Sequence, residues 1–196
     1  MATIAKAALR EGLLAARRSV ADDIRADEAR SLAEHLEALV SNGSTVCAYV
    51  PVGTEPGSIE MLDAVARRGG RVLLPVARTT AEDSPVALQW GEYRPGQLVA
   101  GRFGLLEPAR PWLPATTLAE ASVVLVPALA VDRAGVRLGR GRGFYDRTLV
   151  QRDPQARLIA VIRDEELLDE LPREPHDVSM THALTPGRGL IKLAGT

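Results

Sequence analysis

The spacing of hydrophobic positions predicts two helices at the start of the chain. Residues 3–17 are rich in Ala, Leu and Arg, which favour helices, and their apolar positions form a rough helical stripe. Ser19 and Asp22 have the spacing of a capping box, which indicates where a second helix starts. The buried stripe predicted for this second helix has i, i+4, i+7, i+8 spacing and consists of Leu32, Leu36, Leu39 and Val40.

Short β-prone runs follow, separated by a helical segment. Residues 45–50 and 71–75 are apolar runs bounded by turn residues, as is typical of strands. Between them, residues 58–68 have helical spacing and end at two glycines. A strand, a helix and a strand joined by short links form a βαβ unit, in which the two strands are parallel. Residues 86–90 are a further candidate strand.

The second half of the chain returns to this alternation after a long irregular segment. Residues 91–115 contain many Gly and Pro and show no clear period, and such long segments are often functional. The run that begins at Val123 is the most apolar in the chain, as expected for a strand covered on both faces. Strands are also predicted at 157–162 and 183–186, and helices at 118–121, 146–151 and 164–171, the last capped by Asp164. Together these elements predict a single three-layer α/β domain over residues 1–196 with a mostly parallel sheet.

Composition narrows the class of protein. The 196 residues include 46% hydrophobic and 25% charged residues, with a net charge of −1, so nothing attracts the whole chain to nucleic acid or a membrane. Cys47 is the only cysteine, which excludes an internal disulfide and fits a reducing cytosol. No signal-peptide core or run of about 18 apolar residues is present. We expect a cytoplasmic, monomeric protein that acts on small molecules and binds neither nucleic acid nor a membrane.

The apolar run after Val123 leads into a loop that combines glycine with arginine. Glycine lets a backbone approach a ligand closely, and exposed backbone N–H groups favour anions. Arginine adds a forked donor that suits phosphate or carboxylate. The loop consists of Arg137, Leu138, Gly139, Arg140, Gly141, Arg142 and Gly143, and it leads into Phe144, Tyr145 and Asp146. This pattern predicts a phosphate-binding loop followed by a carboxylate that could hold a metal.

Several standard motifs are absent from the sequence. The G-x-G-x-G spacing differs from the dinucleotide fingerprint, and the loop lacks the lysine of a Walker A motif. There is no G-x-S-x-G motif, and the three histidines do not have zinc spacing. Mg²⁺ often takes only one or two protein carboxylates, so Asp146 suits that role, with Asp177 as a second ligand. A structural alternative for Asp146 is stabilisation of a helix N-terminus.

Three charged residues outside the loop are further candidates. Lys6 and Arg10 are four residues apart, so they project from one helix face, which a purely solvated basic face would also explain. Glu55 follows the predicted strand at 45–50, and ligands bind beyond the carboxyl ends of strands in open α/β sheets. An ordinary exposed loop acid is the alternative for Glu55.

The loop and its flanks closely resemble the signature of a known family. The run Asp132-x-x-Gly135-x-Arg137-Leu138-Gly139-x-Gly141-x-Gly143-Phe144-Tyr145-Asp146 is similar to that of the 5-formyltetrahydrofolate cyclo-ligases, also called methenyltetrahydrofolate synthetases. The resemblance extends to the basic N-terminal helix, the Gly-Leu-Leu-Glu-Pro segment at 104–108 and the Pro-x-x-x-His-Asp segment at 172–177. In three places the chain departs from the family pattern. Val131 and Phe144 replace the usual Phe and the first Tyr, and the acid that often follows Asp177, near the place of Thr181 or His182, is absent, which supports Asp177 less strongly than Asp146 as a metal ligand.

The resemblance implies an ATP- and Mg²⁺-dependent ring closure on a reduced folate. ATP phosphorylates the formyl oxygen of 5-formyltetrahydrofolate, N10 attacks the activated carbon, and 5,10-methenyltetrahydrofolate forms with release of ADP and phosphate. The implied fold is a Rossmann-like sandwich of the isomerase and CoA-transferase-like type.

The resemblance also implies roles for individual residues. Lys6 and Arg10 would bind ATP, with Arg10 also touching the folate, and Asp146 and Asp177 would hold Mg²⁺. Val50 and Glu55 would line the folate site, with Glu55 accepting hydrogen bonds from the pterin. The loop from Arg137 to Tyr145 would bind ATP, and Arg140, Gly141, Arg142, Gly143 and Phe144 would also face the folate. The implied catalytic residues are Arg140, Arg142 and Tyr145.

Two other classes of function compete with this interpretation. A non-catalytic folate- or nucleotide-binding homologue would keep the loop but lose turnover. An RNA-binding module would use the arginines at 133, 137, 140, 142 and 147. The net charge of −1 and the 4% of aromatic residues argue against the RNA-binding module, because single-strand binders need stacking platforms.

Overall fold

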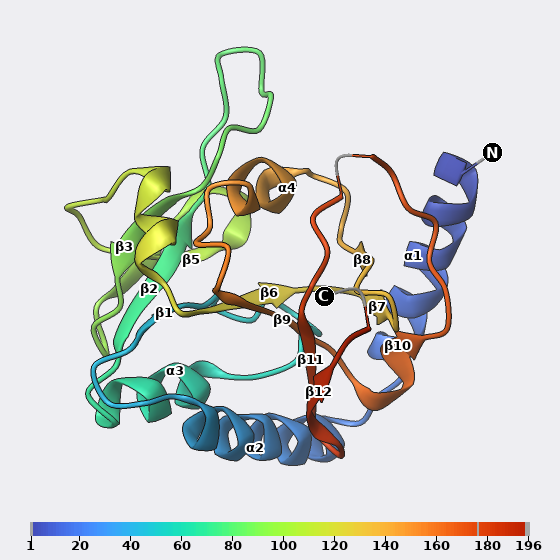
Figure 1. The fold of residues 1–196 in the computed structure, drawn as a ribbon, viewed down its shortest axis with the longest axis horizontal. Helices are drawn as coiled ribbons and strands as arrows, with labels where there is room; N and C mark the ends of the chain where they lie inside the picture. The colour runs from blue at the N-terminus through green and yellow to red at the C-terminus, as the bar shows by residue number, and fades with distance from the viewer. Residues whose placement is uncertain (1, 176, 195–196) are drawn as a thin grey trace.

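A large mixed sheet forms the centre of the molecule, for which the computed structural model describes residues 2–175 and 177–194 (Figure 1). Its seven strands are β1 (Thr45–Cys47), β2 (Arg71–Val76), β3 (Gln89–Glu92), β6 (Val123–Pro127), β9 (Arg157–Val161), β11 (His182–Thr185) and β12 (Gly189–Lys192). They lie in the order β12-β11-β9-β6-β1-β2-β3. The inner five are parallel, and β12 and β3 pair antiparallel at the edges. The predicted α/β class with a mostly parallel sheet is confirmed.

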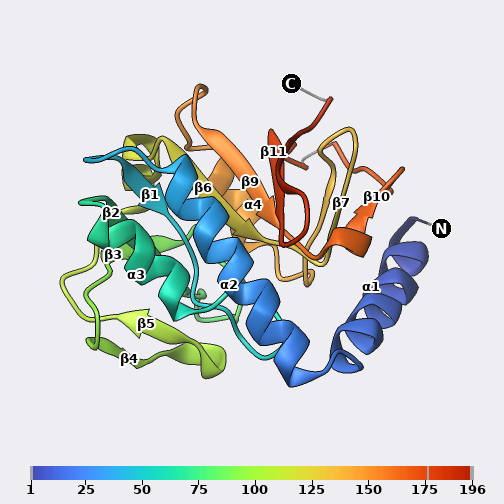
Figure 2. The ribbon, with the colours of Figure 1, turned by 90° about the horizontal axis from the view of Figure 1, so that it is seen from below.

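Helices cover both faces of this sheet. The helices are α1 (Ala2–Arg18), α2 (Asp22–Leu39), α3 (Ile59–Arg67) and α4 (Phe144–Leu149), with 3₁₀ turns η1 (Arg102–Gly104), η2 (Ala115–Glu120) and η3 (Asp164–Glu166). In Figure 1, α2 and α3 lie below the sheet and α4 lies above it, and Figure 2 shows α2 and α3 side by side. Among the helices of the described residues, none has the length and apolar character to cross a bilayer.

The central strand β6 shows how the sequence builds two cores. Its alternate residues Val123 and Leu125 pack into the cluster formed with α2 and α3. Val124 and Val126 point the other way, into the cluster that includes Leu149 of α4. Because side chains alternate along a strand, an unbroken apolar run fills a core on each face.

Helix α1 packs on a second, smaller sheet rather than on the large one. This sheet has the order β10-β7-β8 and consists of β7 (Ala130–Asp132), β8 (Arg137–Leu138) and β10 (Leu167–Leu168). Leu9 and Leu13 of α1 contact a small cluster that contains Val136, Leu138 and Leu171. Figure 2 shows α1 apart from α2, at the side of the molecule. The helix that carries Lys6 and Arg10 is therefore attached to the small sheet next to the Gly/Arg loop.

Asp132 and Gly135 of the family-like signature shape the β7–β8 turn. The Asp132 carboxylate is buried and accepts hydrogen bonds from the backbone N–H groups of Val136 (2.8 Å) and Leu171 (2.9 Å). Gly135 has a positive φ of 87°, and a Cβ there would clash with the carbonyl oxygen of Met180. These two residues therefore hold the hairpin that presents the Gly/Arg loop, rather than contact a ligand.

The helix predicted at 164–171 is wrong. Only Asp164–Glu166 form a 3₁₀ turn, and Leu167 and Leu168 pair in parallel with Val131 and Asp132. Asp164 does not cap a helix, because its carboxylate accepts hydrogen bonds from Thr185 Oγ1 (2.6 Å) and Gly187 N (2.8 Å). A pairing partner more than thirty residues away therefore decides the conformation of this segment against its local pattern.

The predicted capping box at the second helix is also wrong. Ala21 is the N-cap of α2 and makes no side-chain capping bond. The Ser19 hydroxyl instead donates to the Ala16 carbonyl at the end of α1 (2.7 Å). The N-terminus of α2 is instead stabilised by the negative charges of Asp22 and Asp23 in its first turn.

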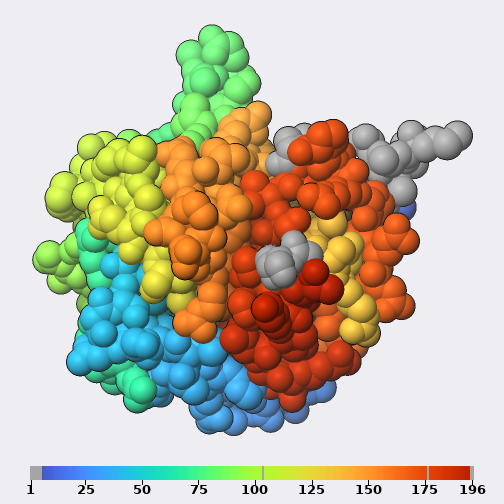
Figure 3. Space-filling view, viewed as in Figure 1, coloured from blue at the N-terminus to red at the C-terminus, as the bar shows by residue number. Residues whose placement is uncertain are grey.

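Most other elements match the predictions, but strands appear where an irregular segment was expected. Residues 91–115 contain the end of β3 and a hairpin of β4 (Leu98–Ala100) and β5 (Leu106–Pro108). Just before β3, an arm closed by a bridge between Thr79 and Pro85 projects from the body, as Figure 3 shows in green. Strand β12 was not predicted, nor was β8, whose residues Arg137 and Leu138 were expected in a loop. The short helix expected at 118–121 is the 3₁₀ turn η2 at 115–120.

Replacing Gly135 tests the constraint on the β7–β8 turn. Gly135→Ala is expected to lower the free energy of unfolding by at least about 2 kcal/mol, because it combines a positive φ with a backbone clash. Gly12→Ala is the matched control, since a Cβ at this helical position meets nothing within 4 Å. That control should be neutral or stabilising by up to about 1 kcal/mol. Equal urea midpoints for the two variants would contradict the assignment.

Candidate active site

A cavity of about 460 Å³ opens at the carboxyl ends of the central strands. Strand β1 pairs with β2 on one side and with β6 on the other, and the chain leaves β1 and β6 toward opposite edges of the sheet. In open α/β sheets, the crevice at such a switch point is where ligands bind. The segments that follow these strands supply part of the cavity wall, including Tyr49, Ala77 and Ala128.

Every site residue predicted from the sequence lines this cavity. They come from α1, from the segment after β1, from β8, the start of α4 and the loop between them, and from the segment before β11. They are Lys6, Arg10, Val50, Glu55, Asp177 and the whole run from Arg137 to Asp146. His176, which belongs to the family-like pattern, lies outside the described residues. The structure thus gathers residues up to 171 positions apart into one site, while their roles stay predictions.

Glycine gives the loop between β8 and α4 its path. Gly141 and Gly143 have φ values of 90° and 74°, which favour glycine, and Gly143 is the N-cap of α4. The Nε of Arg10 donates to the Gly139 carbonyl (2.9 Å), and a Cβ at Gly141 would lie 3.4 Å from the Arg10 guanidinium carbon. Arg10 therefore lies against the loop, bound to the Gly139 carbonyl and next to Gly141.

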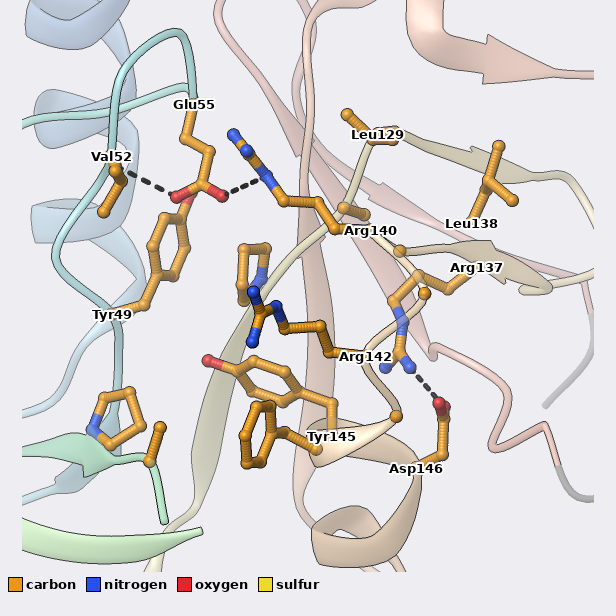
Figure 4. Close-up of a pocket in the computed structure, with 18 of the residues that line it drawn as sticks. Tyr49, Val52, Glu55, Leu129, Arg137, Leu138, Arg140, Arg142, Tyr145 and Asp146 are labelled. Carbon is orange, nitrogen blue, oxygen red and sulfur yellow. Dashed lines mark hydrogen bonds and ion pairs between the residues drawn. The ribbon is translucent and has the colours of Figure 1, made fainter. Parts of the chain in front are cut away.

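Asp146 is paired with the first arginine of the loop. Nη2 of Arg137 donates to Oδ1 of Asp146, and the Arg137 guanidinium lies 5.8 Å from the centre of the Tyr145 ring (Figure 4). Arg137 Nη1 is buried and has no hydrogen-bond partner among the described residues. Asp146 lies in the first turn of α4, where it also favours the helix N-terminus. The ion pair and the helix contribution coexist, so neither excludes a role in metal binding.

Lys6 is buried between two acids of the segment before β11. Its Nζ lies 3.4 Å from Asp177 Oδ2 and 3.3 Å from Glu174 Oε1. Only 7% of Lys6 is exposed, so the alternative of a solvated basic face is wrong for this residue. Asp177 also accepts a hydrogen bond from the Glu174 backbone N–H (2.7 Å), which orients its carboxylate. The two candidate metal ligands, Asp146 and Asp177, are thus each paired with a candidate phosphate ligand.

Glu55 is held between the strand side and the loop side of the cavity. One oxygen accepts the Val52 N–H (3.0 Å) and the other lies 3.0 Å from Arg140 Nε, as Figure 4 shows. With 12% of its side chain exposed, Glu55 is not an ordinary loop acid. Burial, and then the negative charge of Glu55, raise the pKa of Tyr145 and of Tyr49 well above the usual tyrosine value. Both phenols therefore remain neutral.

Several cavity residues were missed from the sequence. Tyr49, Val52, Leu105 and Leu106 supply apolar wall, and Arg17 and Glu174 supply charge. Arg17 follows Lys6 and Arg10 at spacings that keep one helix face, so a signal for it was present. The other residues are defined only by the tertiary structure.

Arg17 links α1 to the turn after β6. It is buried and donates to Glu166 through Nε (2.6 Å) and Nη2 (2.7 Å), and Nη2 also donates to the Ala128 carbonyl (2.6 Å). Glu166 in turn accepts the Arg163 N–H (2.8 Å). This bidentate pair fixes α1 beside the cavity, since forked Arg–carboxylate contacts restrict both distance and orientation.

The donor set fits a magnesium–phosphate ligand better than a metal held by protein alone. In the described part of the chain, no group of three or more His, Cys, Asp or Glu is placed to hold a metal ion. Mg²⁺ commonly takes one or two carboxylates and completes its shell with water and phosphate oxygens. Asp146 and Asp177 could supply those carboxylates beside the cations and glycines of the cavity.

The fold and the site together define a class of protein. The protein is an α/β protein with a Gly/Arg loop and two carboxylates, each paired with a shielded cation, at the switch point of its sheet. The model of the 5-formyltetrahydrofolate cyclo-ligase family matches residues 2–186. The chain belongs to the 5-formyltetrahydrofolate cyclo-ligase family.

Known relatives cover between 74% and 98% of this chain. A 5-formyltetrahydrofolate cyclo-ligase of Mycolicibacterium smegmatis is 61% identical over 98% of this chain and 100% of its own length. The cyclo-ligase of Escherichia coli is 30% identical over 74% of this chain and 79% of its own length. The fold is similar to that of a 5,10-methenyltetrahydrofolate synthetase from Aquifex aeolicus, with a TM-score of 0.74 and 23% identity over 96% and 93% of the two chains. A Mycoplasma pneumoniae synthetase gives a TM-score of 0.68 and 18% identity over 89% and 94%.

Substitution of Arg17 tests the attachment of α1. Arg17→Met is expected to lower the free energy of unfolding by about 3–5 kcal/mol, because it leaves the Glu166 carboxylate buried without its cation. Adding Glu166→Gln should recover part of this loss. The exposed neighbour Arg18 provides the control, and Arg18→Met should change stability by less than about 0.5 kcal/mol. A loss below about 1 kcal/mol for Arg17→Met in urea unfolding would contradict the prediction.

Proposed function

We propose that this protein converts 5-formyltetrahydrofolate to 5,10-methenyltetrahydrofolate, with hydrolysis of ATP to ADP and phosphate. The observation that carries the proposal is the single cavity in which the signature loop, Lys6, Arg10 and Glu55 meet. Membership of the cyclo-ligase family and 61% identity to a relative of that name support it. At one end of the site, cations and loop glycines suit the phosphates of ATP. At the other end, the Glu55 carboxylate suits the hydrogen-bond donors of a pterin.

The chemistry explains why a phosphate site adjoins a folate site. The formyl oxygen is a poor leaving group, so the γ-phosphoryl group of ATP is first transferred to it and ADP leaves. N10 then bonds to the formyl carbon, the carbon–oxygen bond breaks with release of phosphate, and N10 loses its proton. Phosphoryl transfer needs positioning and charge neutralisation more than covalent help from a protein. The cations of the cavity supply that charge.

The phosphate end of the site is formed by α1 and the loop. Lys6, Arg10 and Arg137 bind the ATP phosphates together with backbone N–H groups of the loop, and Arg140, Arg142 and Tyr145 act where the phosphoryl group is transferred. Asp146 and Asp177 hold Mg²⁺, which when bound neutralises charge on the phosphate oxygens. The support is the lining of one cavity by all of these residues and the match of their pattern to the family.

The folate end is formed around Glu55. Its carboxylate accepts hydrogen bonds from the 2-amino and N3–H groups of the pterin, a donor pair that fits two carboxylate oxygens. Val50 and Phe144 contact the ring system, and the apolar wall at Leu105 and Leu106 surrounds it. Arg140 contacts Glu55 and belongs to the phosphate loop, so it couples the two ends.

The remaining properties follow from the same proposal. The fold is a Rossmann-like sandwich of the isomerase and CoA-transferase-like type, supported by the parallel sheet and its switch point. Residues 1–196 act as one domain, because residues from α1 and from the segment before β11 are needed in one cavity. The protein works as a cytoplasmic monomer on small molecules, without nucleic acid or membrane, in keeping with a net charge of −1.

A direct assay tests the function. Purified protein with MgATP and 5-formyltetrahydrofolate should produce the methenyl absorbance and one ADP per product, and omission of ATP should abolish it. The absence of product at saturating MgATP would overturn the proposal. Folate binding without product would instead support a non-catalytic homologue.

Glu55→Gln tests the folate end. Loss of the charged acceptor should raise the KM for 5-formyltetrahydrofolate by about 10–100-fold, since hydrogen bonds to a charged group contribute about 1.5–3 kcal/mol. The KM for MgATP should change little. Glu60→Gln is the control, because Glu60 is an exposed acid of α3 outside the cavity. Unchanged folate kinetics would remove Glu55 from the site.

A further inference from the structure

Two ion pairs in the cavity have the same unusual composition. Lys6 contacts Asp177, and Arg137 contacts Asp146. In each pair the cation is a proposed phosphate ligand and the carboxylate is a proposed magnesium ligand. The residues needed for the two halves of MgATP therefore neutralise one another before the ligand arrives.

The pairs are well shielded from solvent. The side chains of Lys6 and Arg137 are 9% and 7% exposed, and those of Asp177 and Asp146 are 13% and 27% exposed. Glu174 adds a second carboxylate next to Lys6. A shielded charge that loses its partner pays a large desolvation penalty, so neither pair opens without a replacement on both sides.

We propose, building on the function above, that MgATP enters by exchanging these two ion pairs, so that Mg²⁺ and ATP bind with strong positive coupling. The phosphates take Lys6 and Arg137, and Mg²⁺ takes Asp177 and Asp146. The site thereby selects the magnesium complex over either component alone.

Neither ATP alone nor Mg²⁺ alone should bind tightly, for an electrostatic reason. ATP without metal would draw Lys6 and Arg137 away and leave Asp177 and Asp146 unpaired beside a polyanion. Mg²⁺ without ATP would draw the carboxylates away and leave two cations unpaired beside a divalent cation. Only the complex supplies a partner to all four side chains, and by linkage each component must strengthen the binding of the other equally.

The Arg137 guanidinium has a buried hydrogen-bond donor that its ion pair with Asp146 does not use. Nη2 donates to Asp146, whereas Nη1 is buried without a hydrogen-bond partner in the described part of the chain. A buried donor without an acceptor costs free energy, which a phosphate oxygen would recover. Arg137 is therefore prepared to change partners, as the exchange requires.

Calorimetry with Asp177→Asn provides the decisive test, and the heat of binding is independent of turnover. For the wild type, ATP should bind at least about fivefold more tightly as MgATP than with EDTA, within the usual range of coupling free energies. Asp177→Asn removes one of the two carboxylates at Lys6 and leaves only Glu174, so ATP with EDTA should bind several-fold more tightly than to the wild type, while MgATP should bind more weakly. The two affinities move in opposite directions, which a purely structural role would not produce.

A charge-matched control separates local exchange from a general gain of positive charge. Asp169 is 93% exposed and pairs with Arg133 outside the cavity. Asp169→Asn should leave both ATP affinities within about twofold of the wild type. If Asp169→Asn tightens Mg²⁺-free ATP as much as Asp177→Asn does, the exchange is overturned.

The reverse variant tests the same exchange with the metal alone. Lys6→Met releases Asp177, so Mg²⁺ without ATP should bind several-fold more tightly than to the wild type. This arm also decides the matter if Asp177→Asn does not fold. Unchanged or parallel shifts in the variants would overturn the exchange, whereas a wild-type protein that forms no methenyl product would overturn the proposed function itself.

Discussion

The divergence of the chain from β1 and β6 is the constraint on which the whole site depends. These neighbouring parallel strands end side by side, but their continuations travel to opposite edges of the sheet. In the space between the continuations, Glu55, after β1, faces the Gly/Arg loop across one cavity. Arg140 spans that space to reach Glu55. The sheet thus determines the distance between Glu55 and the Gly/Arg loop, for which we propose pterin and phosphate binding.

The regular parts of the fold could be predicted because their signals are local. The run from Val123 to Pro127 is apolar on every position, and only a strand covered on both faces uses such a pattern well. The helix prediction for 164–171 failed because Leu167 and Leu168 pair with β7, which is far away in the sequence. The β4–β5 hairpin was not predicted for the same reason, because pairing rather than hydrophobic periodicity defines its strands.

The candidate site also has a part that the sequence predicts and a part that only the tertiary structure defines. Loop glycines and arginines have a recognisable spacing, so the sequence was sufficient to name them and to place Glu55 after a strand. The partners of these residues were not predictable, because Lys6 meets Asp177 and Arg17 meets Glu166 only through tertiary structure. The apolar wall has no sequence signal of its own, since leucines there look like any others.

The attachment of α1 has a consequence for how the protein folds during synthesis. Arg17 is translated 149 residues before Glu166, and Leu9 and Leu13 pack against a sheet completed by Leu168. At about 5–20 residues per second, ribosomal synthesis leaves α1 without its docking surface for roughly 10–30 seconds. During that interval the apolar and basic side chains of α1 lack the partners that they have in the folded protein. Slow or interrupted translation of the final third would therefore leave α1, with Lys6 and Arg10, undocked for longer, together with a large sheet that still lacks β9, β11 and β12.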